Sequence, residues 1–308
     1  AIFFGVYLIV EGQITQGALI GAVILGGRIM GPLSQLANTL ARVNGALNAY
    51  RDLSKLIGKS FNSASELSPI SRSSLEGEIE FKNVSFKFEG SKQPTINNVS
   101  FKIPAGQKVA LVGKMGSGKS TMSKLIAGMI EPTAGSILID GVDVRQIDPA
   151  DVRKNIGVML QDSWLFSGTI RENIQMGNNE YEDEHVLEIC KVAGVDDFVG
   201  SHPKGYDLEI RERGIGLSGG QKQTINLARS LLHKPEILLL DEPTSSMDQG
   251  TEQKVISSLQ EFCKDKTMLI VTHRNPILAM VDRVFIMENG SLITDQTPEQ
   301  LGIKKVAK

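Results

Sequence analysis

The sequence predicts an α/β fold that is preceded by an apolar helical segment. A glycine-rich loop at residues 113–120 lies between a short apolar run and a helical pattern. Two near-continuous apolar runs, 236–240 and 268–271, are typical of buried parallel strands. Residues 14–36 are apolar and rich in glycine and alanine, as helices packed in a membrane often are.

Length, charge and cysteine content restrict the class of protein. The 308 residues are enough for two structural units, and the formal net charge of -2 gives no reason to expect a nucleic-acid partner. The chain begins at Ala1 inside an apolar run, so we expect it to be the C-terminal piece of a longer protein. Cys190 and Cys263 lack metal-ligand spacing and are expected to be buried, reduced thiols.

Residues 1–57 are predicted to be the C-terminal part of a transmembrane domain. Residues 1–10 are apolar but shorter than the roughly 20 residues that span a bilayer, so they represent the end of one span. The stretch 14–36 is the predicted last span. Helical spacing continues to Tyr50, which predicts one long helix that becomes amphipathic. The alternative is an amphipathic helical hairpin packed on a soluble domain.

Basic residues and a change in composition mark the end of this segment. Four cations follow the apolar stretch and indicate a cytoplasmic exit: Arg42, Arg51, Lys55 and Lys59. Residues 58–77 are rich in serine and contain Pro69, so they are a predicted linker. The predicted main domain is 78–302, followed by a tail at 303–308.

The main domain is expected to begin with an antiparallel β subdomain. Apolar and polar residues alternate across 79–88, which predicts a strand there. Residues 96–103 are a second predicted short strand. The alternation changes parity at Asn83, which predicts a β-bulge. Asp140-Gly141 predicts a turn, and Asn289-Gly290 predicts a hairpin near the C-terminus. Helical spacing across about 163–233 predicts a mostly helical subdomain that ends in a helix from 218 to 233.

The glycine-rich loop predicts a P-loop NTPase core. Its residues are Gly113, Lys114, Met115, Gly116, Ser117, Gly118, Lys119 and Ser120, with Thr121 following. Glycines let backbone N–H groups approach phosphate oxygens, and the helix N-terminus adds positive partial charge. Lys119 is expected to reach the β- and γ-phosphates of ATP, and the Ser120 hydroxyl to ligate Mg²⁺. A glycine-rich turn that caps an ordinary helix is the alternative, which the flanking strand and helix disfavour.

An acidic pair follows the apolar run 237–240. Open α/β sheets bind ligands at the C-terminal ends of their strands. Asp241 is therefore expected to hold Mg²⁺, and Glu242 to orient and polarise the attacking water as a catalytic carboxylate. A loop acid or helix cap is the alternative, and the P-loop upstream weakens it.

The third motif is Leu217-Ser218-Gly219-Gly220-Gln221, and with it the sequence resembles the nucleotide-binding domain of ATP-binding-cassette (ABC) transporters. The motif looks like the signature of that family. A helix N-terminus with a flexible backbone can cap a γ-phosphate. The resemblance implies that it caps ATP bound by the opposite subunit of a homodimer. An ordinary N-cap explains Ser218 but not both glycines.

The resemblance covers residues 78–302 and implies further site residues. Gln161 looks like the lid glutamine that senses Mg²⁺ and water, so the resemblance implies that it binds Mg²⁺ and takes part in catalysis. His273 matches the switch histidine that touches the γ-phosphate, and Phe88 stands where the family stacks an aromatic ring, usually Tyr, on adenine. Ser246 and Asp248 are similar to the loop that crosses the dimer interface.

Two positions depart from the family pattern. Met247 replaces the commoner Leu, and Arg211 replaces a residue that is commonly Gly. Arg211 precedes Glu212-Arg213-Gly214, which resembles the exporter loop that contacts membrane helices.

The resemblance implies an ATPase, with ATP and Mg²⁺ as cofactors, that drives export across the bacterial inner membrane from a cytoplasmic nucleotide-binding domain. Gly27-Arg28 and residues 32–36 look most like the fused permease/ATPases of type I protein secretion. The implied partners are a second copy, the chain's own upstream transmembrane domain, membrane lipid, an exported protein or peptide, a periplasmic adaptor and an outer-membrane channel.

Three other functions are alternatives. A lipid or drug exporter would use the same domain, and a soluble ABC ATPase could act as a mechanical switch without the apolar residues 1–57. A non-catalytic nucleotide-binding module is disfavoured by four intact positions: Lys119, Asp241, Glu242 and His273.

Overall fold

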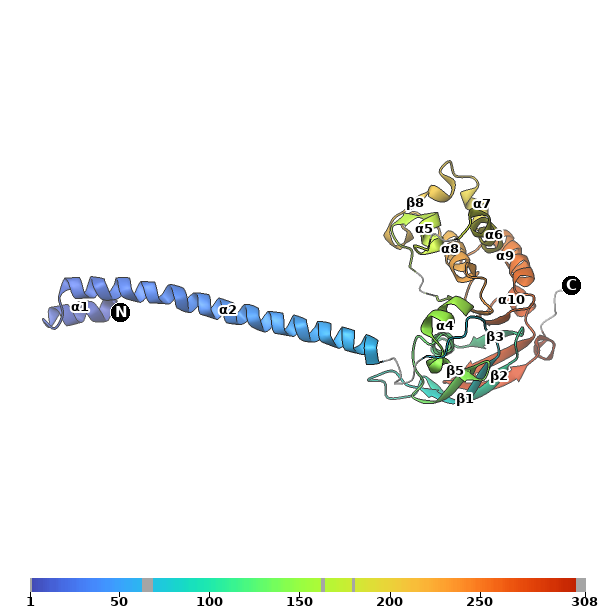
Figure 1. Ribbon diagram of the computed structural model, residues 1–308, viewed down its shortest axis with the longest axis horizontal. Coiled ribbons are helices and arrows are strands. Elements are labelled where there is room, and N and C mark those ends of the chain that lie inside the picture. The colour runs from blue at the N-terminus through green and yellow to red at the C-terminus, as the bar shows by residue number, and fades with distance from the viewer. Residues whose placement is uncertain (1, 63–68, 162–163, 179–180, 303–308) are drawn as a thin grey trace. The chain divides into compact units, whose positions relative to one another are not determined.

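The computed structural model describes residues 2–62, 69–161, 164–178 and 181–302. The chain forms two compact units, residues 1–66 and 67–308 (Figure 1). The predicted tail at 303–308 lies outside the described residues.

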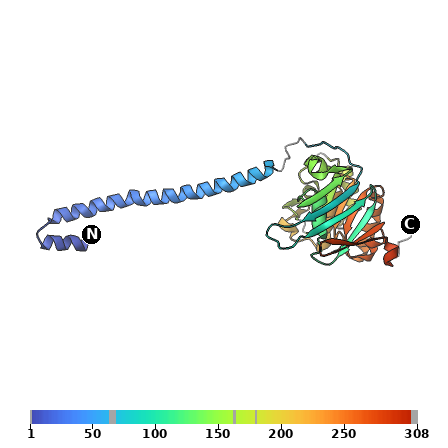
Figure 2. The ribbon, with the colours of Figure 1, turned by 90° about the horizontal axis from the view of Figure 1, so that it is seen from below.

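The first unit is a helical hairpin. Helix α1 (Ile2–Val10) is joined by a turn to α2 (Gln16–Asn62), and α1 folds back along the first turns of α2 (Figure 2). The helices approach closely at Gly5, where an added Cβ would lie 2.1 Å from a methyl carbon of Leu19. The predicted single long helix is confirmed. It continues to Asn62, so residues 58–62 of the predicted linker are helical.

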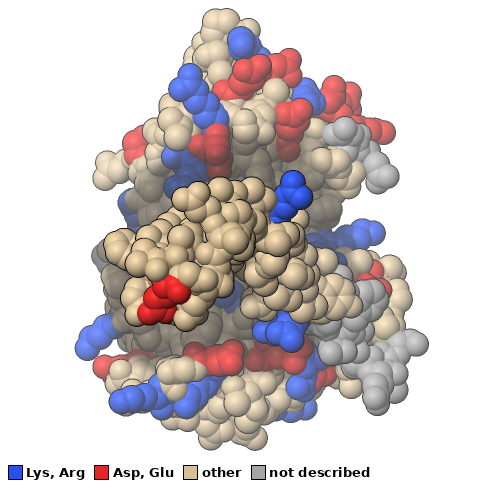
Figure 3. All heavy atoms as spheres, turned by 90° about the vertical axis from the view of Figure 1, so that its left-hand side faces the viewer, with Lys and Arg blue, Asp and Glu red and all other residues tan. Residues whose placement is uncertain are grey.

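Beyond the turns that α1 contacts, helix α2 presents an apolar surface that nothing else described in its unit covers. The part from Gln16 to Lys55 is long and apolar enough to cross a membrane, with a mean hydropathy of 1.4 in its most apolar window. Leu25 and Met30 are 61% and 63% exposed. Glu11 is the only charged residue from 2 to 27, and Figure 3 shows this end of the hairpin as an almost uncharged surface. Apolar surface on this scale calls for lipid or for other helices.

We expect the full chain to partition into the detergent phase when Triton X-114 separates. Leu25→Lys should shift it toward water, because a lysine at the centre of a spanning helix costs about 2.5–3.5 kcal/mol. Leu53→Lys, placed near the basic end of α2, is the matched control and should have a smaller effect. Recovery of the unsubstituted chain in the aqueous phase, monodisperse, would favour the soluble ATPase.

The second unit contains a four-stranded antiparallel sheet with the order β2-β1-β4-β5. Its strands are β1 (Ile79–Phe86), β2 (Ile96–Ile103), β4 (Ala134–Ile139) and β5 (Val142–Asp143). The β1–β2 register shifts between Phe81 and Val84, and Asn83 between them has a φ of 49°. The bulge predicted from the change of parity is therefore confirmed, because one extra residue restores the buried face.

A six-stranded sheet with the order β12-β11-β3-β10-β9-β6 carries the site. Its strands are β3 (Lys108–Gly113), β6 (Ile156–Met159), β9 (Ile237–Asp241), β10 (Thr267–Val271), β11 (Arg283–Glu288) and β12 (Ser291–Gln296). All pairs are parallel except β11–β12, the predicted hairpin. Every residue of β9 and β10 is buried, as the apolar runs predicted.

Helices pack against this sheet, and some of them form a separate helical subdomain. The α-helices are α3 (Lys119–Ile126), α4 (Pro149–Asn155), α5 (Ile170–Gln175), α6 (Asp183–Ala193), α7 (Asp196–Val199), α8 (Gly219–Leu231), α9 (Gln249–Phe262) and α10 (Asn275–Leu278). The 3₁₀ turns are η1 (Val144–Gln146), η2 (Gly205–Asp207), η3 (Glu212–Gly214) and η4 (Pro298–Leu301). The predicted helical subdomain is present as α5 to α8 (Figure 1), with one unpredicted two-stranded sheet, β7 (Gly168–Thr169) and β8 (Glu209–Ile210).

Strand β9 separates two hydrophobic cores. Leu238 and Leu240 belong to a core shared with the helical subdomain, whereas Ile237 and Leu239 belong to a core shared with the antiparallel sheet. Successive strand residues point to opposite faces, so one strand serves both cores. The strand end that carries Asp241 is held from both sides as a result.

Cys190 and Cys263 are both fully buried, and neither forms a disulfide.

Candidate active site

A cleft of about 560 Å³ lies where the P-loop meets the C-terminal ends of β9 and β10. Its lining includes ten predicted site residues: Met115, Gly116, Gly118, Lys119, Ser120, Thr121, Gln161, Asp241, Glu242 and His273. Thr95, Ser245 and Val271 complete the lining and were not among the predicted site residues. The structure therefore brings together the P-loop, the acidic pair, the glutamine and the histidine.

Two glycines of the P-loop occupy positions that a side chain could not share. Gly118 has a φ of 102°, and a Cβ there would lie 2.8 Å from the carbonyl oxygen of Thr95. A Cβ on Gly113 would lie 2.3 Å from the carbonyl oxygen of Met287. The loop between them leads directly into α3, which starts at Lys119. The backbone is therefore tightly packed from behind while its open side faces the cleft.

Lys119 extends back over the loop that precedes it. Its Nζ donates to the carbonyl oxygens of Gly113 and Lys114, at 2.7 and 2.8 Å. These two carbonyl oxygens hold the positively charged ammonium group of Lys119 above the loop. That charge and the N-terminus of α3 both favour a phosphate group in the cleft.

Ser120 and Asp241 meet across the cleft although they are far apart in sequence. The Ser120 Oγ donates to an Asp241 carboxylate oxygen at 2.6 Å, and Asp241 is only 3% exposed. A hydroxyl and a carboxylate in one place form the all-oxygen donor set that Mg²⁺ prefers. The residues present thus fit the predicted Mg²⁺ site, and the exposed Gln161 lines the same cleft.

Glu242 has an unusual backbone conformation. Its φ is 48°, in the left-handed region that non-glycine residues rarely occupy. Burial raises the pKa of its carboxyl group, while His273, Arg274 and Lys119 act in the opposite direction. The Nε2 of His273 lies 3.9 Å from a Glu242 carboxylate oxygen. Backbone strain and a raised pKa at one carboxylate are features that concentrate at functional sites.

The signature residues 218–221 are not among the described residues that line this cleft. Ser218 caps α8: its Oγ accepts from the backbone N–H of Gln221, whose side-chain oxygen accepts from the backbone N–H of Ser218. A Cβ on Gly220 would lie 2.9 Å from the carbonyl oxygen of Ser246. The N-cap thus explains Ser218, and a close approach to the 245–247 loop explains Gly220.

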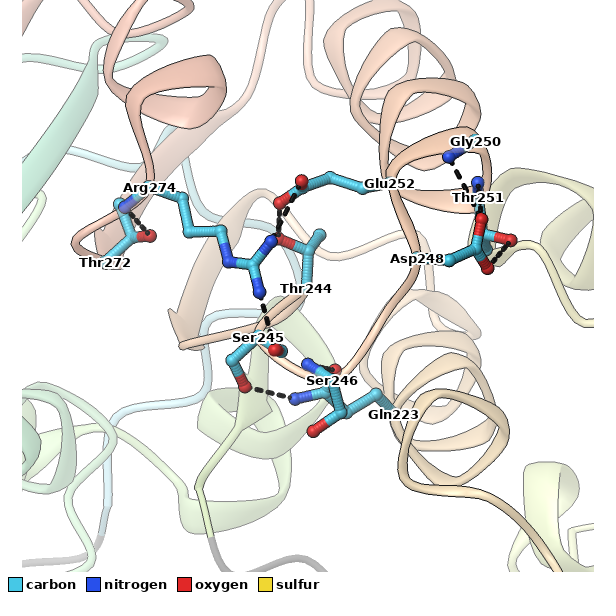
Figure 4. Close-up of polar contacts among 10 residues, drawn as sticks. All are labelled: Gln223, Thr244, Ser245, Ser246, Asp248, Gly250, Thr251, Glu252, Thr272 and Arg274. Atoms are coloured by element: carbon cyan, nitrogen blue, oxygen red, sulfur yellow. Dashed lines mark hydrogen bonds and ion pairs between the residues drawn. The ribbon is translucent and has the colours of Figure 1, made fainter.

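The other predicted residues also lie outside the lining of the cleft. Asp248 caps α9 by accepting the backbone N–H groups of Gly250 and Thr251, and these bonds lower its pKa (Figure 4). Phe88 follows the end of β1, is 46% exposed, and meets Phe86 edge-on with ring centroids 4.8 Å apart. A half-exposed ring leaves surface free for a ligand.

The predicted membrane-contact loop carries a cation–π pair that the sequence did not indicate. The guanidinium of Arg213 lies 4.4 Å from the centroid of the Trp164 ring. Trp164, Phe166 and Ile215 are 53%, 56% and 63% exposed. Apolar groups therefore gather at the surface beside 212–214. Arg211 is the exposed residue before η3, and nothing in the structure explains why it replaces the commoner glycine.

Comparison with known proteins supports this description. The ABC transporter family matches residues 96–245. The chain is 36% identical over 295 residues to a putative multidrug export ATP-binding/permease protein, YgaD of Bacillus subtilis (strain 168), and covers 51% of that protein and 96% of itself. It is 34% identical to the leukotoxin export ATP-binding protein LtxB of Aggregatibacter actinomycetemcomitans, with 97% of this chain and 42% of that protein covered.

Two further similarities agree with these. The chain is 33% identical to the alpha-hemolysin translocation ATP-binding protein HlyB of Escherichia coli O157:H7, with 99% of this chain and 43% of that protein covered. A solved structure of a bacterial Atm1-family ABC exporter with ATP bound matches with a TM-score of 0.74 and 30% identity, covering 94% of this chain and 51% of the other. The chain spans about half the length of the proteins it matches.

Proposed function

Since this chain carries the ATPase domain of an ABC transporter, we propose that it hydrolyses ATP to drive an exporter. One observation carries this proposal: Lys119, the Ser120–Asp241 pair and Glu242 converge on one cleft. The hairpin of α1 and α2, with its exposed apolar surface, is the proposed connection to the membrane.

Each residue of the cleft has a proposed role. Lys119 and the loop N–H groups bind the ATP phosphates. Ser120, Asp241 and Gln161 hold Mg²⁺, which when bound neutralises charge on the β- and γ-phosphates. Glu242 orients the attacking water and accepts its proton, and His273 is close enough to Glu242 to contact the γ-phosphate beside it. Phe88 stacks on adenine.

The complete site is proposed to need a second copy of the chain. Residues 218–221 lie outside the cleft, yet they form the N-terminus of α8, where the positive partial charge of the helix suits an anion. In a homodimer each copy would place this helix N-terminus against the ATP bound by its partner. Ser246 and Asp248, in the loop that packs on the signature glycines, would lie at the same interface.

We expect Mg-ATP to promote dimerisation of the full chain when hydrolysis is blocked by Glu242→Gln. Sedimentation in detergent, with and without Mg-ATP, measures this change. Adding Gly219→Asp to that variant should abolish it, because a carboxylate would face the γ-phosphate of the partner's ATP. Mg-ADP is the control for nucleotide binding without a γ-phosphate. An unchanged mass at high protein concentration would contradict the shared site.

The cargo is proposed to be a protein or peptide secreted across the bacterial inner membrane. The similarity of Gly27-Arg28 and 32–36 to type I secretion proteins supports this, as do relatives named for leukotoxin and alpha-hemolysin export. A periplasmic adaptor and an outer-membrane channel would then be partners. The similarity to a putative multidrug export protein favours a small-molecule exporter as the second candidate.

A further inference from the structure

The peptide groups on both sides of Glu242 are held by hydrogen bonds from other elements. Its backbone N–H donates to the carbonyl oxygen of Val271 on β10 at 2.9 Å. Its own carbonyl oxygen accepts from the Nε2 of Gln223 at 3.1 Å. A left-handed φ in a residue other than glycine persists only where the surroundings enforce it. The Glu242 carbonyl oxygen also accepts the backbone N–H of Ser245 at 3.3 Å. These three hydrogen bonds hold the backbone of Glu242 and so set the direction of its side chain.

Gln223 lies in the second turn of α8, and both its amide nitrogen and its amide oxygen form hydrogen bonds to one loop. Besides the Glu242 carbonyl, its Nε2 donates to the Ser245 Oγ at 2.7 Å, and its Oε1 accepts the backbone N–H of Ser246 at 2.8 Å (Figure 4). Three bonds thus join the signature helix to residues 242–246. The close approach of Gly220 to Ser246 adds direct contact between the same two segments.

A buried carboxylate secures the other side of this loop. Glu252 is 4% exposed, accepts the Thr244 Oγ at 2.7 Å, and accepts Nη1 of Arg274 at 3.0 Å. Nη2 of Arg274 donates to the carbonyl oxygen of Ser245 at 2.6 Å (Figure 4). The loop is therefore anchored on one side by α9 and Arg274, and on the other by Gln223. Gln223 therefore links α8 to the backbone of Glu242 by hydrogen bonds.

We propose that Gln223 is a positioning residue for Glu242, coupling the start of α8 to the direction of the catalytic carboxylate. This inference rests on the proposed function of Glu242. The start of α8 would contact the ATP of the partner subunit, whereas Glu242 acts on the ATP of its own subunit. Gln223 would thus make each carboxylate depend on whether the neighbouring site is occupied and closed.

Gln223→Glu tests the proposal in the full chain. The substitution keeps the acceptor for the Ser246 N–H but replaces the donor to Glu242 with a carboxylate oxygen that repels its carbonyl. A misplacement of about 1 Å can cost about 10²-fold in rate. We expect kcat for ATP hydrolysis to fall by up to that factor, with KM and the ATP dissociation constant changed less than about twofold. Gln260→Glu, at an exposed glutamine on α9, is the matched control and should leave both constants unchanged.

The double variant Gln223→Glu, Glu242→Gln decides whether Gln223 acts through Glu242. We expect it to hydrolyse ATP at the rate of Glu242→Gln alone. Once the side chain at position 242 is inactive, misdirecting it should not lower the rate further. A further loss equal to that of Gln223→Glu in the unsubstituted chain would overturn the proposal. So would a kcat within twofold of normal in the single variant.

Two measurements separate this inference from its premises. Near-normal turnover in Glu242→Gln by itself overturns the proposed role of Glu242, whereas additivity in the double variant overturns only the role of Gln223. Thermal unfolding checks that each variant is folded. If Gln223→Glu unfolds, Gln223→Met carries the same test, since it keeps the length of the side chain and lacks both the donor and the acceptor.

Discussion

Replacing Glu242 with Gln is expected to lower steady-state ATP hydrolysis by about 10²- to 10⁴-fold, the range of general-base assistance. Gln keeps the shape of the side chain but removes the basic oxygen that accepts the proton of water. ATP binding should survive, because the proposed phosphate ligands, Lys119 and the P-loop, are unchanged in this variant. The variant should therefore accumulate with ATP bound. Phosphate release and nucleotide binding, measured on the same preparation, check both parts.

The control for this prediction is Glu261→Gln, an exposed carboxylate on α9 that loses the same charge away from the cleft. It should hydrolyse ATP at the normal rate. Near-normal turnover in Glu242→Gln would instead move the catalytic role to another group, with His273, 3.9 Å away, the next candidate.

Replacing Lys119 with Ala should weaken ATP binding itself. Hydrogen bonds to charged groups contribute about 1.5–3 kcal/mol, which corresponds to about a 10- to 150-fold rise in the dissociation constant. Hydrolysis should fall with it, because the γ-phosphate would lose one of the cations proposed to bind it. Titration calorimetry with ATP in the presence of Mg²⁺ measures the constant.

Lys124→Ala is the matched control for Lys119→Ala, because it removes the same charge from the other end of α3. Its dissociation constant should stay within twofold of normal. Unchanged ATP affinity in Lys119→Ala would place the phosphates elsewhere. Weakened binding in Lys119→Ala, with intact binding and slow turnover in Glu242→Gln, would separate the two roles.

Local patterns in the sequence predicted most of the fold. The runs that became β9 and β10 are apolar at nearly every position, because both faces of a parallel sheet are covered. The bulge at Asn83 was visible because strand residues alternate between faces, so an extra residue changes the parity. The two-residue strands β7 and β8 were missed, since two residues carry no period.

The residues of the candidate site also fall into a group that the sequence predicted and a group that it did not. The P-loop and Asp241-Glu242 were predicted because their chemistry needs particular residues at fixed spacing. Thr95 and Val271 were missed because they line the cleft through position alone, without a motif. The bond from Gln223 to the Glu242 carbonyl was equally invisible. It joins a helix to a loop 19 residues later. It also depends on the positive φ of Glu242, which residue type alone does not predict.

The two cysteines have a practical consequence for labelling this protein. Burial raises the pKa of both thiols to about 12, so at neutral pH only about one molecule in 10⁵ carries a thiolate at either position. Thiolates are the species that react with maleimide probes. A single cysteine introduced at an exposed position would therefore take up a fluorophore or spin label while Cys190 and Cys263 stay unmodified. Distances between two copies could be followed spectroscopically without first removing the native cysteines from the one core that both help to fill.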